Sequence, residues 1–367
     1  PSIADPFLPK KIEEGRIEDI RECIGCNICI TGDMTMSISR CTQNPTFMEE
    51  WRKGWHPEQM NVKGKSENVL VVGSGPAGLE AARALSERGY DVAIAEADTM
   101  IGGRVTHERK LPGLSAWGRV IDYREYQISQ KPNVETYFDS ELDSDNILEF
   151  GFQNICIATG AKWRVDGVSR QHVVPMPMDS AMPIYTPDDI MTGNMPEGSA
   201  VVYDDDHYYM GSVIAERLAK SGQKVTLVTP QDTISAWGYY TYDRWRAQSR
   251  LMEMGVKLIV SKTLKDFGGG RAKLSCTYTG ADTSLDCASV VMVTSRKPND
   301  TIYTELSTLT DSNVDKAPKT LKRIGDCEAP AIIAAAVYSG HRYARDLEEI
   351  LDPDNPLKHD RVFFQDT

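Results

Sequence analysis

The sequence predicts an α/β fold, in which a cysteine-rich loop segment precedes two Rossmann-like domains and the second domain is inserted in the first. Three observations predict this arrangement. Closely spaced cysteines lie between residues 23 and 41, a strand–glycine loop–helix–strand unit covers residues 68–96, and a weaker copy of that unit covers residues 199–229. Apolar strands that alternate with helices in this way are typical of parallel sheets.

Composition and charge exclude several classes of protein. The 367 residues are 41% hydrophobic, as in ordinary globular proteins, and suffice for two or three domains. A net charge of −12 argues against nucleic-acid binding, which needs basic surfaces. No stretch reaches the roughly 18 apolar residues of a membrane helix, and no secretory leader opens the chain. We therefore expect a cytoplasmic protein with no membrane or nucleic-acid partner.

Four of the eight cysteines are concentrated near the start of the chain. Cys23, Cys26 and Cys29 have the C-x2-C-x2-C spacing by which one loop directs three thiolates at an iron–sulfur cluster, and Cys41 supplies a fourth. In a two-cluster ferredoxin the fourth cysteine follows sooner and precedes a proline. The spacing therefore predicts a single 4Fe-4S cluster. A short amphipathic helix over residues 10–20 is expected to lead into this loop.

Two other uses of these cysteines fit the sequence less well. A zinc site more often has two C-x2-C pairs or a histidine ligand, and the nearest histidine, His56, lies beyond the cysteines beside a proline. Disulfide frameworks are typical of small secreted domains, and this chain is large. An iron–sulfur site is therefore the favoured interpretation, with zinc as the alternative.

Residues 68–96 have the pattern of a dinucleotide-binding unit. An apolar strand at 68–72 runs directly into Gly73-Ser74-Gly75-Pro76-Ala77-Gly78, and a helix and a second strand at 91–95 follow. The first glycine permits a tight turn, the second lets a pyrophosphate approach the backbone, and the third lets helix and strand pack closely. The helix N-terminus offers unpaired N–H groups to phosphates. Glu96 stands where a carboxylate accepts hydrogen bonds from an adenosine ribose.

Two later segments are expected near the same site. Gly103, in Ile101-Gly-Gly-Arg104, is another position at which backbone can approach a ligand closely. Asp326 ends a short strand and precedes a helix. An aspartate in that position commonly lines a dinucleotide crevice, although a plain helix cap would look the same.

Residues 199–229 repeat the unit without two of its three glycines. Aligned with the first unit, the fingerprint positions fall at Asp206, Tyr208 and Gly211, so two of the three glycines are missing. A tyrosine would fill the space that the pyrophosphate needs, and the carboxylates of residues 204–206 would repel it. The second domain is therefore predicted to be a scaffold and not an NAD(P)H site.

With these motifs in place, the chain resembles the iron–sulfur flavoprotein family of trimethylamine, dimethylamine and histamine dehydrogenases, which is related to 2,4-dienoyl-CoA reductase. The resemblance extends over the whole chain. Besides the cysteine loop and the first glycine fingerprint, it rests on Pro1-Ser-Ile-Ala-Asp-Pro6, Cys41-Thr-Gln-Asn44, Gly54-Trp-His-Pro57, Ile101-Gly-Gly103, Leu111-Pro-Gly-Leu114, Asp122-Tyr-Arg-Glu125, Ala158-Thr-Gly160 and Gly325-Asp326.

The resemblance implies a set of cofactors. In this family a (β/α)8 barrel carries FMN and oxidises the substrate, and a 4Fe-4S cluster passes single electrons to electron transfer flavoprotein. The rest has a glutathione-reductase-like fold, whose first Rossmann site holds ADP in the amine dehydrogenases and FAD in the reductases. NADPH binds the second unit in the reductases, so the degenerate second unit here favours ADP, with FAD as the alternative.

The resemblance also implies a division of the chain and a set of ligands. Residues 1–65 would be the end of the barrel plus the cluster segment, 66–184 with 288–350 the ADP/FAD-binding domain, 185–287 the degenerate NAD(P)-type domain, and 351–367 a tail. The cluster ligands would be Cys23, Cys26, Cys29 and Cys41. The nucleotide would be held by Gly73, Ser74, Gly75, Pro76, Ala77, Gly78, Glu96, Ala97, Gly103, Arg104, Leu111 and Asp326.

The barrel with its FMN and its catalytic residues is absent from this chain. Either a separate subunit supplies it or it belongs to the same parent chain, and we expect a homo- or hetero-oligomer. The first functional hypothesis is the electron-transfer portion of an amine dehydrogenase, an oxidoreductase acting on CH–NH donors. The second is an FAD- and NADPH-dependent enoyl reductase. The third is a non-catalytic nucleotide-binding scaffold with a structural metal.

Overall fold

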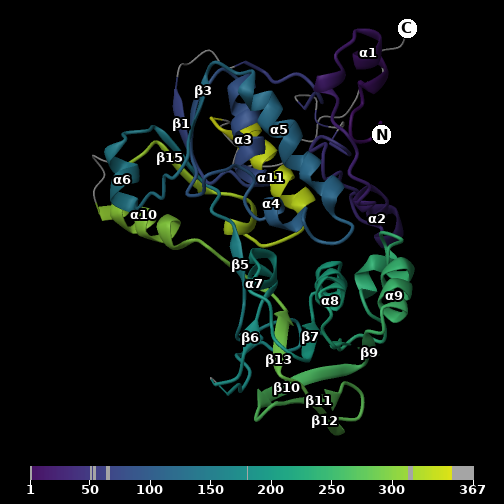
Figure 1. The fold of residues 1–367 in the computed structure, drawn as a ribbon. Helices are drawn as coiled ribbons and strands as arrows, with labels where there is room; N and C mark the ends of the chain where they lie inside the picture. The colour runs from purple at the N-terminus through teal and green to yellow at the C-terminus, as the bar shows by residue number, and fades with distance from the viewer. Residues whose placement is uncertain are drawn as a thin grey trace. The chain divides into compact units, whose positions relative to one another are not determined.

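The structure, a computed structural model, describes residues 2–49, 52, 55–62, 67–179, 181–312 and 317–348. The chain forms two compact units (Figure 1). The first comprises Pro1–Thr106, Ala116–Ala161 and Pro298–Thr367, and the second comprises His107–Ser115 and Lys162–Lys297. The second unit therefore interrupts the first in sequence. The predicted tail at 351–367 lies outside the described residues, and the domain boundaries proposed from the sequence stay predictions.

The first unit is built on a five-stranded parallel sheet. Its strands are ordered β15-β4-β1-β2-β3, and β1 pairs with β2 on one side and with β4 on the other. The apolar run of β1 is buried on both faces, as expected for a central parallel strand. The strands are β1 (Asn68–Val72), β2 (Asp91–Ala95), β3 (Val134–Tyr137), β4 (Asn154–Ile157) and β15 (Thr320–Arg323).

Helices cover both faces of this sheet. Val69 and Val71 share one core with the first helix group, and Leu70 and Val72 share the other core with the second group. The alternation follows from the two-residue period of a strand. The first group, seen together in Figure 1, is α3 (Pro76–Glu87), α5 (Arg119–Ser129) and α11 (Ile333–Asp346), and the second is α6 (Ser144–Glu149) and α10 (Thr301–Ser312).

The N-terminal segment holds two short helices, α1 (Leu8–Glu13) and α2 (Ile28–Thr35). The prediction of a single helix over residues 10–20 is wrong. Gly15 adopts a φ of +71°, which ends α1, and a separate 3-10 turn covers Ile17–Asp19. A glycine in the left-handed region commonly terminates a helix in this way.

The second unit contains another five-stranded parallel sheet, ordered β6-β13-β7-β8-β9, with helices α7, α8 and α9 beside it. A three-stranded antiparallel sheet, β10-β11-β12, lies between β9 and β13 in the sequence. The elements are β6 (Ile184–Tyr185), α7 (Pro187–Thr192), β7 (Ala200–Asp204), α8 (Met210–Lys220), β8 (Val225–Val228), α9 (Arg244–Glu253), β9 (Lys257–Ile259), β10 (Lys262–Gly268), β11 (Arg271–Cys276), β12 (Asp282–Asp286) and β13 (Ser289–Val293).

Three further elements are α4 (Val105–Glu108) and the paired strands β5 (Ala161–Trp163) and β14 (Arg296–Pro298). The two parallel sheets with flanking helices confirm the predicted α/β fold with Rossmann-like domains. Among the described helices, none is both long enough and apolar enough to cross a membrane.

Candidate functional site

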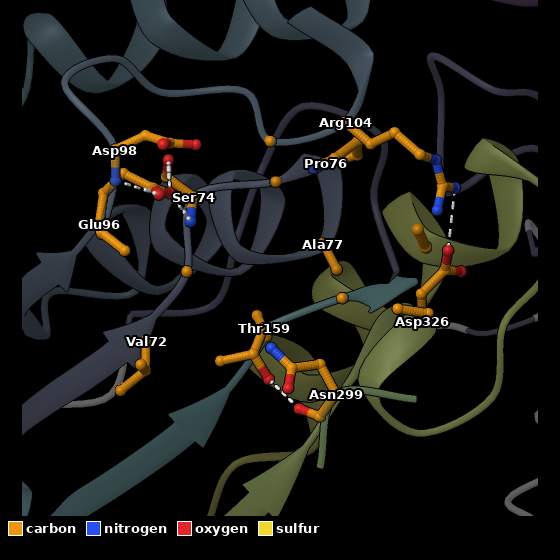
Figure 2. Close-up of a pocket in the computed structure, with 18 of the residues that line it drawn as sticks. Val72, Ser74, Pro76, Ala77, Glu96, Asp98, Arg104, Thr159, Asn299 and Asp326 are labelled. Carbon is orange, nitrogen blue, oxygen red and sulfur yellow. Dashed lines mark hydrogen bonds and ion pairs between the residues drawn. The ribbon is translucent and has the colours of Figure 1, made fainter. Parts of the chain in front are cut away.

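A cavity of about 290 Å³ opens at the carboxyl ends of β1, β2 and β4 in the first unit (Figure 2). In a doubly wound sheet, ligands bind at this edge. Residues from five separate stretches of the chain line the cavity: residues 72–77, 95–98, 103–105, 140–142 and 158–161, joined by side chains near residues 299–302 and 326–336.

The three fingerprint glycines have three different surroundings. Gly73 has a φ of +100°, and a Cβ there would lie 2.6 Å from the carbonyl oxygen of Ala158. A Cβ on Gly78 would lie 2.0 Å from the carbonyl oxygen of Gly73. Gly75 faces open space, with no atom within 4 Å of the position of its missing Cβ. The first and third glycines therefore permit the turn and the packing of α3, whereas the second leaves room in the cavity for a ligand.

Glu96 is held in place by the glycine loop. One oxygen of its buried carboxylate accepts hydrogen bonds from the backbone N–H of Ser74 at 2.8 Å and from the Ser74 hydroxyl, and the other accepts from the N–H of Asp98 at 2.9 Å (Figure 2). A carboxylate has about four acceptor positions, so Glu96 keeps capacity for a ligand hydroxyl group. Its role toward the ribose stays a prediction.

Arg104 and Asp326, which both line the cavity, form an ion pair. An Nη of Arg104 lies 3.0 Å from Oδ2 of Asp326 (Figure 2). Oδ1 of Asp326 accepts a hydrogen bond from the N–H of Ala331 at 2.9 Å. Asp326 does not cap α11, whose N-cap is Ile332 with no side-chain hydrogen bond; it holds the loop before that helix and orients a cation at the cavity.

Most of the residues expected at the nucleotide site line this cavity. They are Gly73, Ser74, Gly75, Pro76, Ala77, Glu96, Ala97, Gly103, Arg104 and Asp326. Gly78 is not in the lining because it packs against the turn, and Leu111 is not in it because it is buried in the segment His107–Ser115 of the second unit. Sequence reasoning missed Asp98, Thr159 and Asn299, which also line the cavity, and the Thr159 hydroxyl donates to the Asn299 carbonyl.

The four N-terminal cysteines line a second, smaller cavity of about 70 Å³ in the same unit. All four are free thiols. Cys29 lies in the first turn of α2, and the preceding loop turns through Gly25 and Asn27, which have φ values of +70° and +54°. The left-handed residues let a short loop return its cysteines to one place. Four converging thiols are the donor set of a 4Fe-4S cluster, so the residues fit that group.

Burial raises the pKa of Cys26 to about 11 and also raises the pKa of Cys29. Thiolates form at such positions when a bound metal group supplies positive charge. Within the part of the chain that the structure describes, no three or more His, Cys, Asp or Glu side chains stand in an arrangement that would hold one metal ion. Support for a cluster therefore comes from the shared cavity and the thiol donor set.

In the second unit, protein side chains fill the space that corresponds to the glycine fingerprint of the first unit. Tyr208 is 8% exposed, and its ring packs edge-on against Tyr209 and Trp237, with centroids 4.8 Å away in both cases. A Cβ on Gly211 would lie 2.4 Å from the carboxyl carbon of Asp204. Burial raises the pKa of Asp204 to about 7. These contacts support the prediction that the unit is a scaffold.

Two family models match parts of the chain. An NAD(P)-binding Rossmann-like domain matches residues 71–140, and an OYE-like second alpha/beta domain matches residues 185–302. The dimethylamine dehydrogenase of Hyphomicrobium sp. (strain x) is 38% identical over 388 residues, covering 98% of this chain and 52% of that protein.

Solved structures agree with this relationship. Histamine dehydrogenase from Rhizobium sp. 4-9 superposes with a TM-score of 0.95 at 58% identity, covering all of this chain and 57% of that one. The 6-hydroxypseudooxynicotine amine oxidase from Pseudomonas geniculata N1 superposes with a TM-score of 0.92 at 43% identity, covering 95% and 52%. This chain belongs to the trimethylamine, dimethylamine and histamine dehydrogenase family of iron–sulfur flavoproteins.

The family assignment confirms the resemblance drawn from the motifs. The chain spans about half the length of the relatives it matches. The substrate, the acceptor and the remaining cofactors of the whole protein are therefore treated below as proposals.

Proposed function

We propose that this chain is the electron-transfer portion of an amine dehydrogenase, with FMN on a (β/α)8 barrel as the electron donor and electron transfer flavoprotein as the acceptor. The barrel belongs to the unmatched half of the relatives, either in the same parent chain or in a separate subunit of a homo- or hetero-oligomer. The observation that carries the proposal is the convergence of Cys23, Cys26, Cys29 and Cys41 on one cavity in a chain of this family.

The chain's own residues supply the binding sites. Three loop cysteines and Cys41 would hold a 4Fe-4S cluster, which exchanges single electrons when it is bound. The 290 Å³ cavity would hold ADP, with the pyrophosphate against Gly75 and the N-terminus of α3 and the ribose near Glu96. We place the chemistry on the amine outside this chain, on the FMN of the barrel, as the family resemblance implies.

The first experiment identifies the nucleotide and the metal. The purified protein is denatured, the released nucleotide is identified by mass, and iron is counted per chain. ADP with about four irons per chain supports the proposal. A matched pair of variants assigns the ligands: Cys26→Ala should lose the visible absorbance of the cluster, and Cys276→Ala, in β11 of the second unit, should keep it. An unchanged spectrum in the first variant would refute the cluster assignment.

A second candidate function is an FAD- and NADPH-dependent enoyl reductase of the same superfamily. The match of residues 185–302 to the OYE-like second alpha/beta domain favours it. The release of FAD in the same experiment, with saturable NADPH binding, would select this function over the first.

A further inference from the structure

Arg124 and Gln43 join the cysteine segment to the nucleotide-binding domain inside the protein core. Arg124, in α5, is fully buried, and Gln43 is 1% exposed. One Nη of Arg124 donates to the Gln43 side-chain oxygen and the other to the Gln43 backbone carbonyl, both at 3.1 Å. The planar guanidinium thus holds Gln43 at two points, which fixes both its backbone and its side chain.

Gln43 in turn joins the two ends of the cysteine segment. Its side-chain N–H group donates to the carbonyl of Glu22 at 2.9 Å and to the carbonyl of Arg119 at 3.2 Å. Glu22 immediately precedes Cys23, whereas Gln43 follows Cys41 by two residues and itself lines the cysteine cavity. One buried amide therefore connects the residue before the first ligand to the residues after the last.

The other side of Arg124 reaches the nucleotide helix. Its Nε donates to Oε2 of Glu80 at 2.8 Å, and Oε1 of Glu80 is 2.9 Å from Nδ1 of His341. Glu80 is fully buried in α3, the helix whose first residues, Pro76 and Ala77, line the nucleotide cavity. The hydrogen bonds therefore run without interruption from the nucleotide helix to both ends of the cysteine loop.

Burying such a set of charges is costly unless every partner is in place, and replacement of one partner leaves the others uncompensated. Apolar side chains form most of the core around α3, and the buried charges of Glu80 and Arg83 are paired within it. Arg124 binds Gln43, and Gln43 binds the carbonyl of Glu22, so these hydrogen bonds connect the two chain positions that flank the predicted cluster ligands. Outer partners of this kind orient ligands and tune the potential of a metal group.

We propose that Arg124 and Gln43 are positioning residues that clamp both ends of the cysteine segment and thereby set the retention and the reduction potential of the cluster. The proposal rests on the proposed function, because it concerns the cluster assigned to these cysteines. Because Arg124 also binds Glu80, the clamp is anchored on α3, the helix that begins at the nucleotide cavity.

The test uses the purified full-length protein with its cluster and compares three substitutions. Gln43→Glu keeps the shape, removes the donor to Glu22 and Arg119, and adds a negative charge beside the cluster cavity. Arg124→Lys keeps the charge and loses the two-point contact with Gln43. Arg83→Lys is the matched control, because Arg83 is also buried and pairs with Glu80 at 2.7 Å, but contacts Glu87 in place of Gln43.

Iron per chain, the EPR spectrum of the reduced cluster and its midpoint potential are measured for each variant. We expect Gln43→Glu to disfavour reduction about tenfold, or 59 mV for one electron. We expect Arg124→Lys to lower iron content or alter the EPR spectrum, and Arg83→Lys to match the wild type. Wild-type potential, spectrum and iron in both clamp variants, or equal changes in the control, would overturn the proposal. A wild-type protein without any cluster would instead overturn the proposed function.

Discussion

The hydroxyl oxygen of Thr42 lies 3.1 Å from the Sγ of Cys26, at the wall of the cysteine cavity. Thr42 follows Cys41 directly, so the residue next to one predicted ligand contacts another. A hydroxyl that donates to a thiolate ligand stabilises negative charge on the sulfur, and hydrogen bonds to sulfur are one of the determinants of iron–sulfur potentials.

From this contact we predict the effect of Thr42→Val, which keeps the side-chain shape and removes the donor. The reduced cluster carries more negative charge than the oxidised one, so the midpoint potential should fall. The loss is of the order of 1 kcal/mol, about a fivefold change in the reduction equilibrium. Potentiometric titration measures it. Thr42→Ser should restore the wild-type value, and a potential unchanged in the valine variant would argue against a hydrogen bond to Cys26.

The glycine fingerprint yields a paired prediction. Gly75 has a φ of −67° and no neighbour within 4 Å of its missing Cβ, so Gly75→Ala should fold normally, with an unfolding free energy within about 1 kcal/mol of wild type. Its methyl group would occupy the space for the pyrophosphate, and ADP affinity should fall at least about tenfold. Calorimetry on nucleotide-free protein tests this.

Gly73→Ala should lower the stability of the fold, in contrast to Gly75→Ala. Its φ of +100° and the 2.6 Å approach to the Ala158 carbonyl place the penalty in the folded state, so the unfolding free energy should fall by about 2–4 kcal/mol. Denaturant unfolding measures this. If Gly75→Ala binds ADP as tightly as the wild type does, the pyrophosphate does not lie against that glycine.

The parts of the site that came from local patterns could be predicted from the sequence. The strands Asn68–Val72 and Asp91–Ala95 coincide with the predicted ranges, because an apolar run followed by glycine has one favoured interpretation. The shared cavity of the four cysteines follows from a local pattern in the same way, because three of them stand on one short stretch, and their role as cluster ligands stays a prediction. The helix over residues 10–20 failed because a single glycine, Gly15, decided its end.

The parts that depend on tertiary structure could not be predicted in this way. Asn299 joins the nucleotide cavity from a segment far along the chain, and no local pattern marks it. Arg124 and Gln43 belong to residue types that are mostly exposed in proteins, yet both are buried. A buried polar pair is recognised only when its partners are in view, since burial without partners would be unfavourable.

The buried histidine of α11 predicts a pH effect on stability. Arg345 donates to Nε2 of His341 at 3.1 Å, so that nitrogen is unprotonated and the ring is neutral, with its proton on Nδ1 facing Glu80. Burial lowers the pKa of His341 to about 4. The unfolded chain takes up this proton near pH 6.5, whereas the folded chain does so only near pH 4.

Between these values the unfolded state binds more protons, so the His341 contribution to stability is present above pH 6.5 and is lost as the pH falls toward 4, by at most about 3 kcal/mol. The variant His341→Gln mimics the neutral ring and has no proton to gain. The unfolding free energy of the wild type relative to this variant, from urea titrations at pH 7.5 and pH 5, should therefore decrease on acidification. A difference that is constant with pH would contradict the neutral assignment.

The last prediction concerns the second unit, where NADPH should show no saturable binding up to about 1 mM. The ring of Tyr208 packs against Tyr209 and Trp237, and Asp204 stands against Gly211 where the third glycine of a working fingerprint would approach its strand. A dinucleotide phosphate would have to displace the tyrosine and approach a buried carboxyl group, which costs both packing and charge repulsion. Calorimetry with NADPH, beside an ADP titration of the same nucleotide-free preparation as the positive control, measures this. Micromolar NADPH binding would mean that the unit rearranges to admit the cofactor, and would favour the enoyl reductase function over the electron-transfer one.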